Sequence, residues 1–305
     1  MNLYIGIDGG GSKTKCVLCD ESLNIISEFQ SGPSNFLTIG TEKVSQTILE
    51  LVKKCCEDQN IDSSIIKRIV FGTTGAGRES DAENISRAIL KTAKSSRIAI
   101  NSMSVVSDAR IALEGAFSGN AGSILIAGTG SIMFGKDRSG IIHRVGGFGR
   151  LIGDEGSGLT IGRLGLNIVA KCYDGRIASS LLKDKVESKF QINNQNQLII
   201  EVYNENLKVQ TVAPLVMEAA EEGDRHCLEI LDKQTDELMI HIMTMKEKLK
   251  DDEMKLVLIG GTVTSENKYS QMLKDKIRVL MPKIILQKPE HPPEIGAVIM
   301  AKGIE

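Results

Sequence analysis

The sequence predicts an α/β fold built from two similar halves. In both halves, short apolar runs typical of strands alternate with longer helical patterns, as expected of an α/β layer. A glycine-rich turn between two strands occurs once in each half, at residues 7–12 and 126–131. With 305 residues, 41% of them hydrophobic and 25% charged, the chain is long enough to form two globular domains.

The first half follows a regular order of strands and helices. A hairpin comes first, because the glycine turn has an apolar run on each side. The elements expected here are strands at 3–7 and 16–19, a helix at 41–58, a strand at 66–71, a helix at 81–94, a strand at 104–106 and a short helix opening at Asp108.

A small, flexible stretch, residues 119–122, is the expected domain boundary. We therefore expect one domain over 1–118 and a second over 119–290, with a C-terminal helix at 291–305 packing back on the first. The polar stretch 191–210 is interpreted as a surface elaboration. The second half is expected to hold a hairpin of strands 123–127 and 132–135, helices at 159–173 and 177–190, two helices broken at 223–224, a strand at 255–259 and a last helix at 294–302.

Composition excludes several classes of function. The net charge of −2 gives no electrostatic reason to expect nucleic acid or an anionic membrane as a partner. No apolar run reaches the roughly 20 residues of a membrane helix, and the N-terminus lacks a signal-peptide pattern, so a cytoplasmic protein is expected. Cys16 and Cys19 spell C-x-x-C, but on a strand they point to opposite faces. We expect reduced cysteines and no structural zinc.

The two glycine turns indicate phosphate binding. Ser12-Lys13-Thr14 lacks the last glycine of a Walker A motif, and a strand follows where a dinucleotide fingerprint needs a helix. In a hairpin tip, glycines let the backbone approach a polyphosphate, and Ser or Thr hydroxyls add donors. A β-branched side chain at Gly10 or Gly130 is expected to block that approach and to misfit the turn's dihedral angles. The alternative is that both are plain hairpin turns.

Three acidic side chains are candidates for the chemistry. Asp8 ends the first strand beside the glycine turn and could hold Mg²⁺ through water, whereas the second turn has Ala127 at that position. Asp108 follows a strand and opens a helix, a position that suits a general base, although Ser107 or Asp108 could simply cap that helix. Asp154 lies in the glycine-rich segment 146–158, which suggests a binding loop rather than a surface turn.

Asn35 follows the turn-rich stretch Ser31-Gly32-Pro33-Ser34. Its side-chain amide can both donate and accept hydrogen bonds with a polar ligand, although an Asn that only shapes a turn is the alternative.

Six segments occur in the order expected of N-acetylglucosamine kinases within the BadF/BadG/BcrA/BcrD ATPase family, and the chain resembles that family over essentially its full length. The resemblance implies two ribonuclease-H-like domains with an active-site cleft between them. It also implies Mg²⁺ with ATP, and the family suggests a homodimer. The segments are 8–12, 34–35, 106–108, 128–131, 146–158 and 259–262.

The resemblance assigns residues to two substrates. Phe148 stands where the mammalian kinases have Trp, and Thr74 matches a serine, so the identity of the sugar stays open. The sugar site implied comprises Asn35, Thr74, Asp108, Ser131, Gly147, Phe148 and Asp154. The nucleotide site comprises Ser12, Thr129, Ala213, Gly260, Gly261 and Ser265, together with Gly10, Gly11, Lys13 and Gly130 of the two turns.

The expected function is phosphorylation of a hydroxyl, O6 of an amino sugar such as N-acetylglucosamine, by ATP, with Asp108 as the base. Glucosamine and N-acetylmuramic acid are alternative substrates. A second alternative is an ATP-driven activator of the same family, which holds an iron–sulfur cluster through cysteines; here no cysteine lies between Cys56 and Cys172. A sugar-binding regulator without catalysis is disfavoured by Asp8 and Asp108. No organic cofactor is implied.

Overall fold

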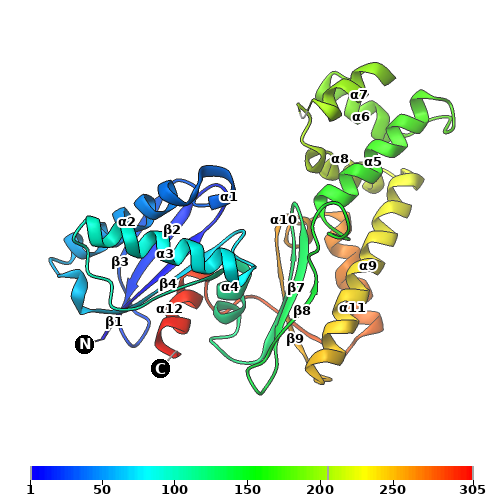
Figure 1. Cartoon of the computed structure of the whole chain (residues 1–305). Helices are drawn as coiled ribbons and strands as arrows, with labels where there is room; N and C mark the ends of the chain where they lie inside the picture. Colours follow the sequence, from blue (N-terminus) through cyan, green and yellow to red (C-terminus); the bar gives the residue numbers. More distant parts are fainter. Residues whose placement is uncertain (1, 205, 304–305) are drawn as a thin grey trace. The chain divides into compact units, whose positions relative to one another are not determined.

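The computed structural model describes residues 2–204 and 206–303, which form two compact units (Figure 1). One unit comprises the chain up to Gly122 together with the segment from Lys288 onward. The other comprises Ser123–Gln287. The α/β class predicted from the alternation of strands and helices is confirmed.

The first unit is built on a five-stranded mixed sheet of order β3-β2-β1-β4-β5. The first three strands form an antiparallel meander, and β4 and β5 run parallel to β1. This arrangement brings the ends of β1, β4 and β5 to one edge of the sheet. The strands are β1 (Leu3–Gly9), β2 (Thr14–Cys19), β3 (Ile25–Ser31), β4 (Ile66–Thr73) and β5 (Met103–Ser107).

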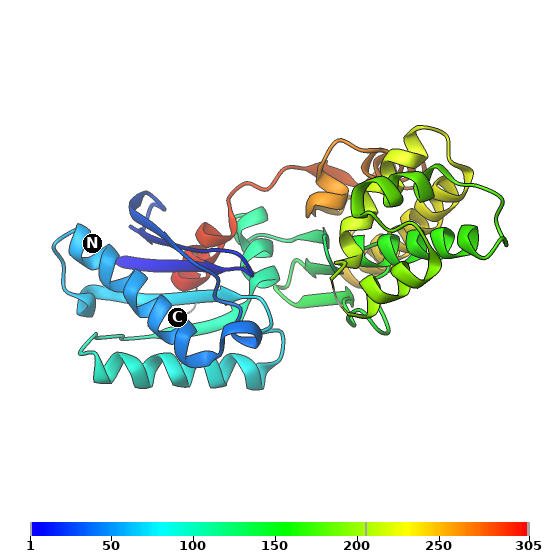
Figure 2. The ribbon, with the colours of Figure 1, turned by 90° about the horizontal axis from the view of Figure 1, so that it is seen from above.

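Helices cover both faces of this sheet. The helices α2 (Thr41–Asp58) and α3 (Glu79–Ser95) lie on one face, while α4 (Asp108–Ala116) and the C-terminal α12 (Pro293–Gly303) lie on the other (Figures 1 and 2). Helix α12 approaches β1 so closely that a Cβ at Gly6 would lie 2.1 Å from the Glu294 carbonyl oxygen. Two short helices, α1 (Phe36–Ile39) and the 3₁₀ turn η1 (Ser63–Ile65), complete the unit.

The second unit repeats the strand order of the first. Its sheet runs β8-β7-β6-β9-β10, with β7 and β8 antiparallel and with β9 parallel to both β6 and β10. A single hydrophobic core joins this sheet to the surrounding helices. The strands are β6 (Gly122–Ala127), β7 (Ser131–Lys136), β8 (Ile142–Gly146), β9 (Lys255–Ile259) and β10 (Ile285–Gln287).

The second unit contains more helix than strand (Figure 1). Helix α9 packs against β7 and β8 and also contacts α5, α8 and α11. The polar stretch 191–210 holds the mostly exposed helix α7. The helices are α5 (Gly158–Tyr173), α6 (Leu181–Phe190), α7 (Gln195–Tyr203), the 3₁₀ turn η2 (Val209–Val212), α8 (Ala213–Glu221), α9 (Arg225–Leu249), α10 (Gly261–Thr264) and α11 (Lys268–Leu280).

The cysteines are free thiols, as predicted. Cys16 packs toward α2, with its Sγ 3.7 Å from that of Cys55, while Cys19 packs on the opposite face with α12. Over residues 2–204 and 206–303, no group of three His, Cys, Asp or Glu side chains could hold a metal. Within the same residues no helix is both long and apolar enough to cross a membrane.

Candidate active-site groups in each unit

The β1–β2 hairpin of the first unit ends in an exposed glycine tip. The Gly10 N–H donates to the Lys13 carbonyl (2.9 Å), and Gly11, Ser12 and Lys13 are exposed beyond it. The Ser34 N–H donates to the Gly10 carbonyl (3.2 Å), which ties the next loop to the tip. The tip therefore presents its residues to solvent from a fixed base.

The glycines of the two tips differ from expectation in one respect. Neither Gly10 nor Gly130 has a positive φ, so the prediction that a side chain would misfit the turn's dihedral angles is wrong. At Gly10 a Cβ would meet only the Lys13 carbonyl, at 3.3 Å. At Gly130 a Cβ would lie 3.0 Å from an Asp154 carboxylate oxygen, so a side chain at position 130 would crowd that carboxylate.

Asp8 is a carboxyl group at the end of β1 whose ionisation is disfavoured. Burial, together with the negative charges of Glu294 and Asp108, raises the pKa of Asp8 to about 6, against a smaller opposing effect of Lys13. Glu294 is buried and pairs with Lys15 at 2.8 Å. Asp8 and Asp108 thus face a shared region of high negative potential, which a cation would relieve.

Asp108 is the first residue of α4, but it is not the residue that caps this helix. That role belongs to Ser107, whose Oγ accepts from the Arg110 N–H at 3.2 Å. One oxygen of Asp108, Oδ2, instead accepts from the Thr74 hydroxyl at 2.7 Å, and Oδ1 accepts from the Ala109 N–H. The carboxylate is half-buried and oriented from two sides.

Asn35 does shape the local backbone. It is the N-cap of α1, and its Oδ1 accepts from the Leu37 N–H at 3.1 Å. The turn-forming interpretation is therefore correct for its carbonyl oxygen. Its Nδ2 donates to no protein group in the described part of the chain, so that amide group is available to a ligand.

In the second unit, the tip of the β6–β7 hairpin docks on the start of α5. The Gly158 N–H donates to the Gly128 carbonyl (2.7 Å), and the Leu159 N–H donates to that of Thr129 (3.2 Å). Gly260, with φ +100°, lies so close behind the tip that a Cβ would come within 2.2 Å of the Ala127 carbonyl. The hairpin, α5 and the β9–α10 turn therefore meet at one place.

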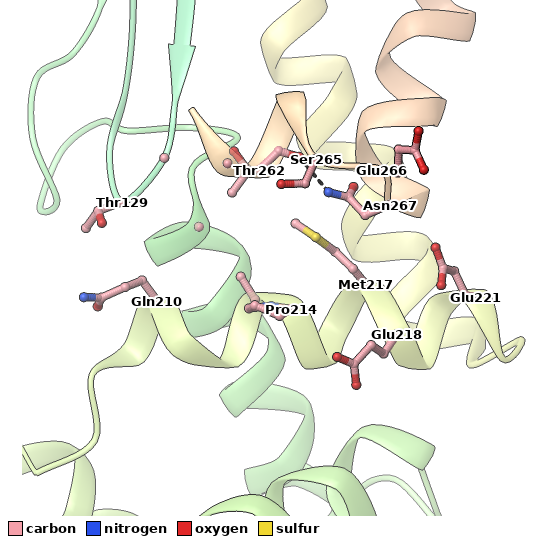
Figure 3. A pocket seen from close by; sticks show the side chains of 14 residues that line it. Thr129, Gln210, Pro214, Met217, Glu218, Glu221, Thr262, Ser265, Glu266 and Asn267 are labelled. Atoms are coloured by element: carbon pink, nitrogen blue, oxygen red, sulfur yellow. Dashed lines mark hydrogen bonds between the residues drawn. The ribbon is translucent and has the colours of Figure 1, made fainter. Parts of the chain in front are cut away.

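A pocket of about 460 Å³ opens where these elements meet (Figure 3). Four of the residues expected to bind nucleotide line it: Thr129, Ala213, Gly261 and Ser265. Gly130 and Gly260 are adjacent in sequence to the lining residues Thr129 and Gly261. The other four expected residues, Gly10, Gly11, Ser12 and Lys13, belong to the first unit. The other lining residues are Gly128, Gly158, Gln210, Pro214, Met217, Glu218, Glu221, Thr262, Glu266 and Asn267.

The pocket has two chemically different ends. In Figure 3, Thr129 and Gln210 lie at one end, and Glu221 and Glu266 lie at the other. The Met217 side chain points into the space between them. Of the described residues that line the pocket, none carries a positive charge.

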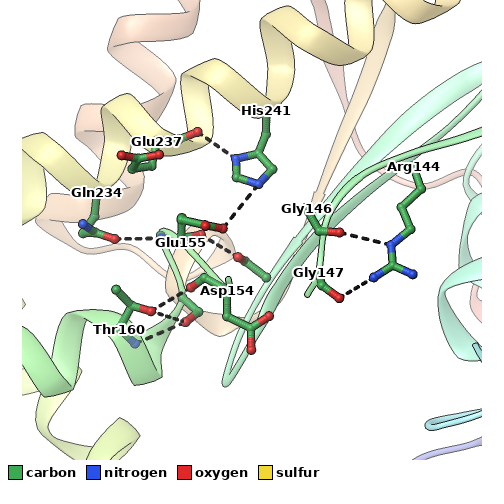
Figure 4. A network of polar contacts seen from close by, with 12 residues as sticks. Arg144, Gly146, Gly147, Asp154, Glu155, Thr160, Gln234, Glu237 and His241 are labelled. Carbon is green, nitrogen blue, oxygen red and sulfur yellow. Dashed lines mark hydrogen bonds and ion pairs between the residues drawn. The ribbon is translucent and has the colours of Figure 1, made fainter. Parts of the chain in front are cut away.

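A polar network holds the second half of the glycine-rich segment 146–158 against α9 (Figure 4), and Tyr269 adds a contact from α11. The Gly156 N–H donates to Gln234 Oε1 (2.9 Å), and the Tyr269 hydroxyl donates to the Gly156 carbonyl (2.9 Å). The buried His241 donates a hydrogen bond from Nδ1 to the Glu237 carbonyl (2.7 Å), and its Nε2 lies 3.9 Å from Glu155 Oε2.

Of the four residues that the resemblance assigned to sugar in this unit, Gly147, Phe148 and Asp154 belong to that segment, and Ser131 is hydrogen-bonded to it. Asp154 has φ +60°, and its carboxylate lies beside Gly130. The Ser131 hydroxyl already donates to the Glu155 carbonyl, so it could serve a ligand only as an acceptor. Phe148 is 68% exposed and lies under the Arg144 guanidinium, which also donates to the Gly147 carbonyl.

Most of the pocket residues on the α8 side were not predicted from the sequence. Gln210 falls within the expected surface elaboration, but η2 packs on α5 so tightly that a Cβ at Gly162 would meet the Val209 carbonyl at 2.1 Å. That end of the stretch is therefore part of the pocket wall. Pro214, next to Ala213, could have indicated from the sequence that a helix begins here, because Pro is favoured in the first turn of a helix.

Two known proteins are similar in sequence to nearly the whole chain. An N-acetylmuramic acid/N-acetylglucosamine kinase of Clostridium acetobutylicum is 30% identical over 99% of both chains. An N-acetyl-D-glucosamine kinase of Dictyostelium discoideum is 30% identical over 98% of this chain and 97% of its own.

Solved structures show the same fold. A candidate N-acetylglucosamine kinase of Chromobacterium violaceum superposes with a TM-score of 0.74 at 22% identity, covering 99% of each chain. A ROK family glucokinase of Streptomyces griseus, solved with glucose and AMPPNP, gives 0.55 at 14% identity, covering 99% of this chain and 98% of its own. The expected ribonuclease-H-like character of the two domains is confirmed by these folds.

The model of the BadF/BadG/BcrA/BcrD ATPase family matches residues 5–301. The chain belongs to the BadF/BadG/BcrA/BcrD ATPase family.

Proposed function

We propose that this chain is an ATP-dependent sugar kinase that transfers the γ-phosphoryl group of ATP to O6 of an amino sugar, N-acetylglucosamine being the first candidate. Two relatives that match this chain over nearly their whole length are named as kinases of this sugar. The observation that carries the proposal is Asp108, a carboxylate freed from helix capping and oriented by Thr74.

Nucleotide binding is proposed for the pocket of the second unit. The backbone of the β6–β7 tip and the Thr129 hydroxyl would face the phosphates, as glycine tips commonly do. Met217 and Pro214 give an apolar surface suited to a base, and the far end, with Glu221 and Glu266, could accept hydrogen bonds from ribose hydroxyls.

Asp108 would act as the general base. It would take the proton from the sugar hydroxyl as the oxygen attacks the γ-phosphorus and the bond to the β–γ bridging oxygen breaks, leaving ADP and the sugar phosphate. The Thr74 hydroxyl, bound to Oδ2, would keep the carboxylate turned toward its substrate. Asp108 belongs to the first unit and the proposed nucleotide pocket to the second.

Mg²⁺ fits the residues present. It usually binds one or two carboxylates and keeps several waters, and Asp8 beside Asp108 is such a pair. When bound, the ion would neutralise phosphate charge, which matters in a pocket without basic lining. Asp8 would hold it through water, and Lys13 would add positive charge at the hairpin tip.

Sugar binding is proposed for Asn35 in the first unit and, separately, for Asp154 in the second. The free Nδ2 of Asn35 can donate to a sugar hydroxyl, and the Asp154 carboxylate can accept from another. Ser131, Gly147 and Phe148, which belong to the same unit as Asp154, are proposed to contact the sugar as well. Glucosamine and N-acetylmuramic acid remain alternative substrates, the latter because the Clostridium relative is named for both sugars.

The activator alternative finds less support. An iron–sulfur cluster shared by two subunits needs accessible thiolates. Five of the six cysteines are buried, and burial raises the pKa of the sixth, Cys172, which disfavours its thiolate.

A sugar panel tests the proposed function. ADP release from Mg-ATP should be slow alone and should rise strongly with N-acetylglucosamine, less with glucosamine or N-acetylmuramic acid. ADP release independent of every sugar would favour an activator, and sugar binding without ADP release would favour a regulator; either result would contradict a kinase.

A further inference from the structure

Arg144 of β8 holds the start of the glycine-rich segment 146–158 (Figure 4). Its Nε donates to the Gly146 carbonyl at 3.1 Å, and its Nη2 donates to the Gly147 carbonyl. Its guanidinium carbon lies 5.6 Å from the centre of the Phe148 ring, a cation–π contact. The part of the chain that the structure describes contains no carboxylate ion-paired with Arg144, so this side chain serves the segment rather than a salt bridge.

Two successive glycines allow one side chain to reach both carbonyls. Gly146 has φ +69° and Gly147 has φ +72°, left-handed values that residues with a side chain rarely adopt. On this course of the backbone, both carbonyl oxygens point toward Arg144 (Figure 4). The N–H donors of a guanidinium lie in one plane in a fixed fork, so one arginine can hold two neighbouring carbonyls. Arg144 therefore fixes the orientation of two successive peptide groups.

The same two peptide groups carry the N–H groups of Gly147 and Phe148. In a trans peptide group the N–H points opposite to the C=O, and the described chain has no cis peptide bond. Both N–H groups therefore point away from Arg144. Neither of them donates to a protein acceptor within residues 2–204 and 206–303. The segment thus presents two adjacent backbone donors that the fold itself does not use.

We infer that Arg144 is a positioning residue for the sugar: by holding the two carbonyls, it aims the N–H groups of Gly147 and Phe148 at one oxygen atom of the bound sugar, in a hydroxyl or the acetamido group. This inference rests on the proposed function, in which Gly147 and Phe148 contact the sugar. A sugar that covers these donors without offering them an oxygen leaves them unpaired, which costs binding free energy. The pair therefore selects for a sugar that carries an acceptor at that place, and Arg144 itself needs no contact with it.

The test is a calorimetric titration of the full chain, without ATP, with N-acetylglucosamine and with analogues that each lack the acetamido group or one hydroxyl. In Arg144→Gln, N-acetylglucosamine should bind about tenfold more weakly than in the wild type, because the two donors are no longer aimed. The analogue that lacks the accepting oxygen should bind the wild type and Arg144→Gln about equally, since the two changes remove the same interaction. The other analogues should each lose the same tenfold as N-acetylglucosamine.

Two further variants separate positioning from a general effect of the charge. Arg144→Lys should lie between the wild type and Arg144→Gln, because one ammonium group can hold one of the carbonyls but lacks the planar fork. Arg138→Gln is the matched control: Arg138 lies in the turn between β7 and β8, its side chain is 82% exposed, and it pairs with Asp251. This control should bind every sugar like the wild type.

Equal weakening of all the sugars in Arg144→Gln would overturn the inference, because it would show that Arg144 only keeps the segment in shape. Unchanged affinity for N-acetylglucosamine, or equal weakening in Arg138→Gln, would overturn it too. The inference and the kinase proposal fail separately, because binding here is measured without turnover. An inactive chain in which one analogue is insensitive to Arg144→Gln would refute only the kinase, and an active chain without such an analogue would refute only the role of Arg144.

Discussion

Asp108 begins α4, yet its carboxylate is free for chemistry because a neighbour caps the helix. Asp108→Asn keeps the size of the side chain and removes the base, so we expect kcat to fall by roughly 10²- to 10⁴-fold. ATP affinity, measured by calorimetry, should stay near the wild-type value. Ser107→Ala is the control: it should cost about 1 kcal/mol of stability through the lost cap but leave kcat nearly unchanged. Near-normal turnover in Asp108→Asn would remove the base from the mechanism.

The surroundings of Asp8 disfavour its ionised form. Because its pKa in the folded chain is about 6, above the ordinary 3.8, the folded protein keeps a proton that the unfolded chain releases between those values. The contribution of this group to stability therefore falls as pH rises through that window. Above about pH 6, the ionised Asp8 destabilises the fold unless a cation neutralises it.

Asp8→Asn should therefore raise the Tm by roughly a few degrees at pH 7.5 without Mg²⁺, and by much less near pH 4. The same variant should need far more Mg²⁺ for turnover, and in the wild type the Mg²⁺ requirement should rise below about pH 6. The exposed Glu21→Gln is the control, with neither effect expected. A destabilised Asp8→Asn protein with a normal Mg²⁺ requirement would show that Asp8 has a structural role only.

At the level of elements, the nucleotide pocket is a junction of the β6–β7 tip, the β9–α10 turn and α8. Gly261 begins α10 and lacks a positive φ, and a Cβ added there would meet nothing within 4 Å. Gly261→Val should therefore fold normally, with its side chain reducing the pocket volume.

We expect Gly261→Val to weaken ATP binding about tenfold or more, with sugar affinity little changed. Gly303→Val, which also meets open space but lies in α12 of the other unit, is the control. Unchanged ATP affinity in the folded Gly261→Val protein would move the nucleotide away from this pocket.

The helices and strands also differ in how far sequence predicts them. The helix at 41–58 was predictable to the residue, because its apolar face is regular and fully used. The helix expected from 177 begins only at Leu181, because Ser180 caps it and is itself held by Asp224 at 2.6 Å. The edge strand β3 was not predicted, since only one of its seven residues is buried and its sequence shows no clear apolar run.

The pocket itself lay beyond sequence patterns. Thr129, Gln210 and Asn267 line one cavity although they are far apart along the chain. Glycine turns identify where a backbone can approach a phosphate, but only the packing of η2 on α5 brings Gln210 to the wall. The motif residues were therefore predictable, and the residues that shape the pocket between them were not.

At the level of the whole molecule, two units with the same strand order carry different sets of polar groups. The first holds Asp8 and Asp108, and the second holds the nucleotide pocket and Asp154. The second hairpin has Ala127 at the position of Asp8, so the duplicated architecture does not duplicate the carboxylate. The proposed function assigns the base and the metal-holding carboxylate to the first unit and nucleotide binding to the second.

The proposed phosphoryl transfer can be observed by ³¹P NMR of the chain incubated with Mg-ATP and N-acetylglucosamine. We expect equal amounts of ADP and a single sugar phosphate, with its phosphorus coupled to the two protons of C6, and no product from Asp108→Asn. Free inorganic phosphate in place of a sugar phosphate, or a phosphate on another carbon of the sugar, would contradict the proposed reaction.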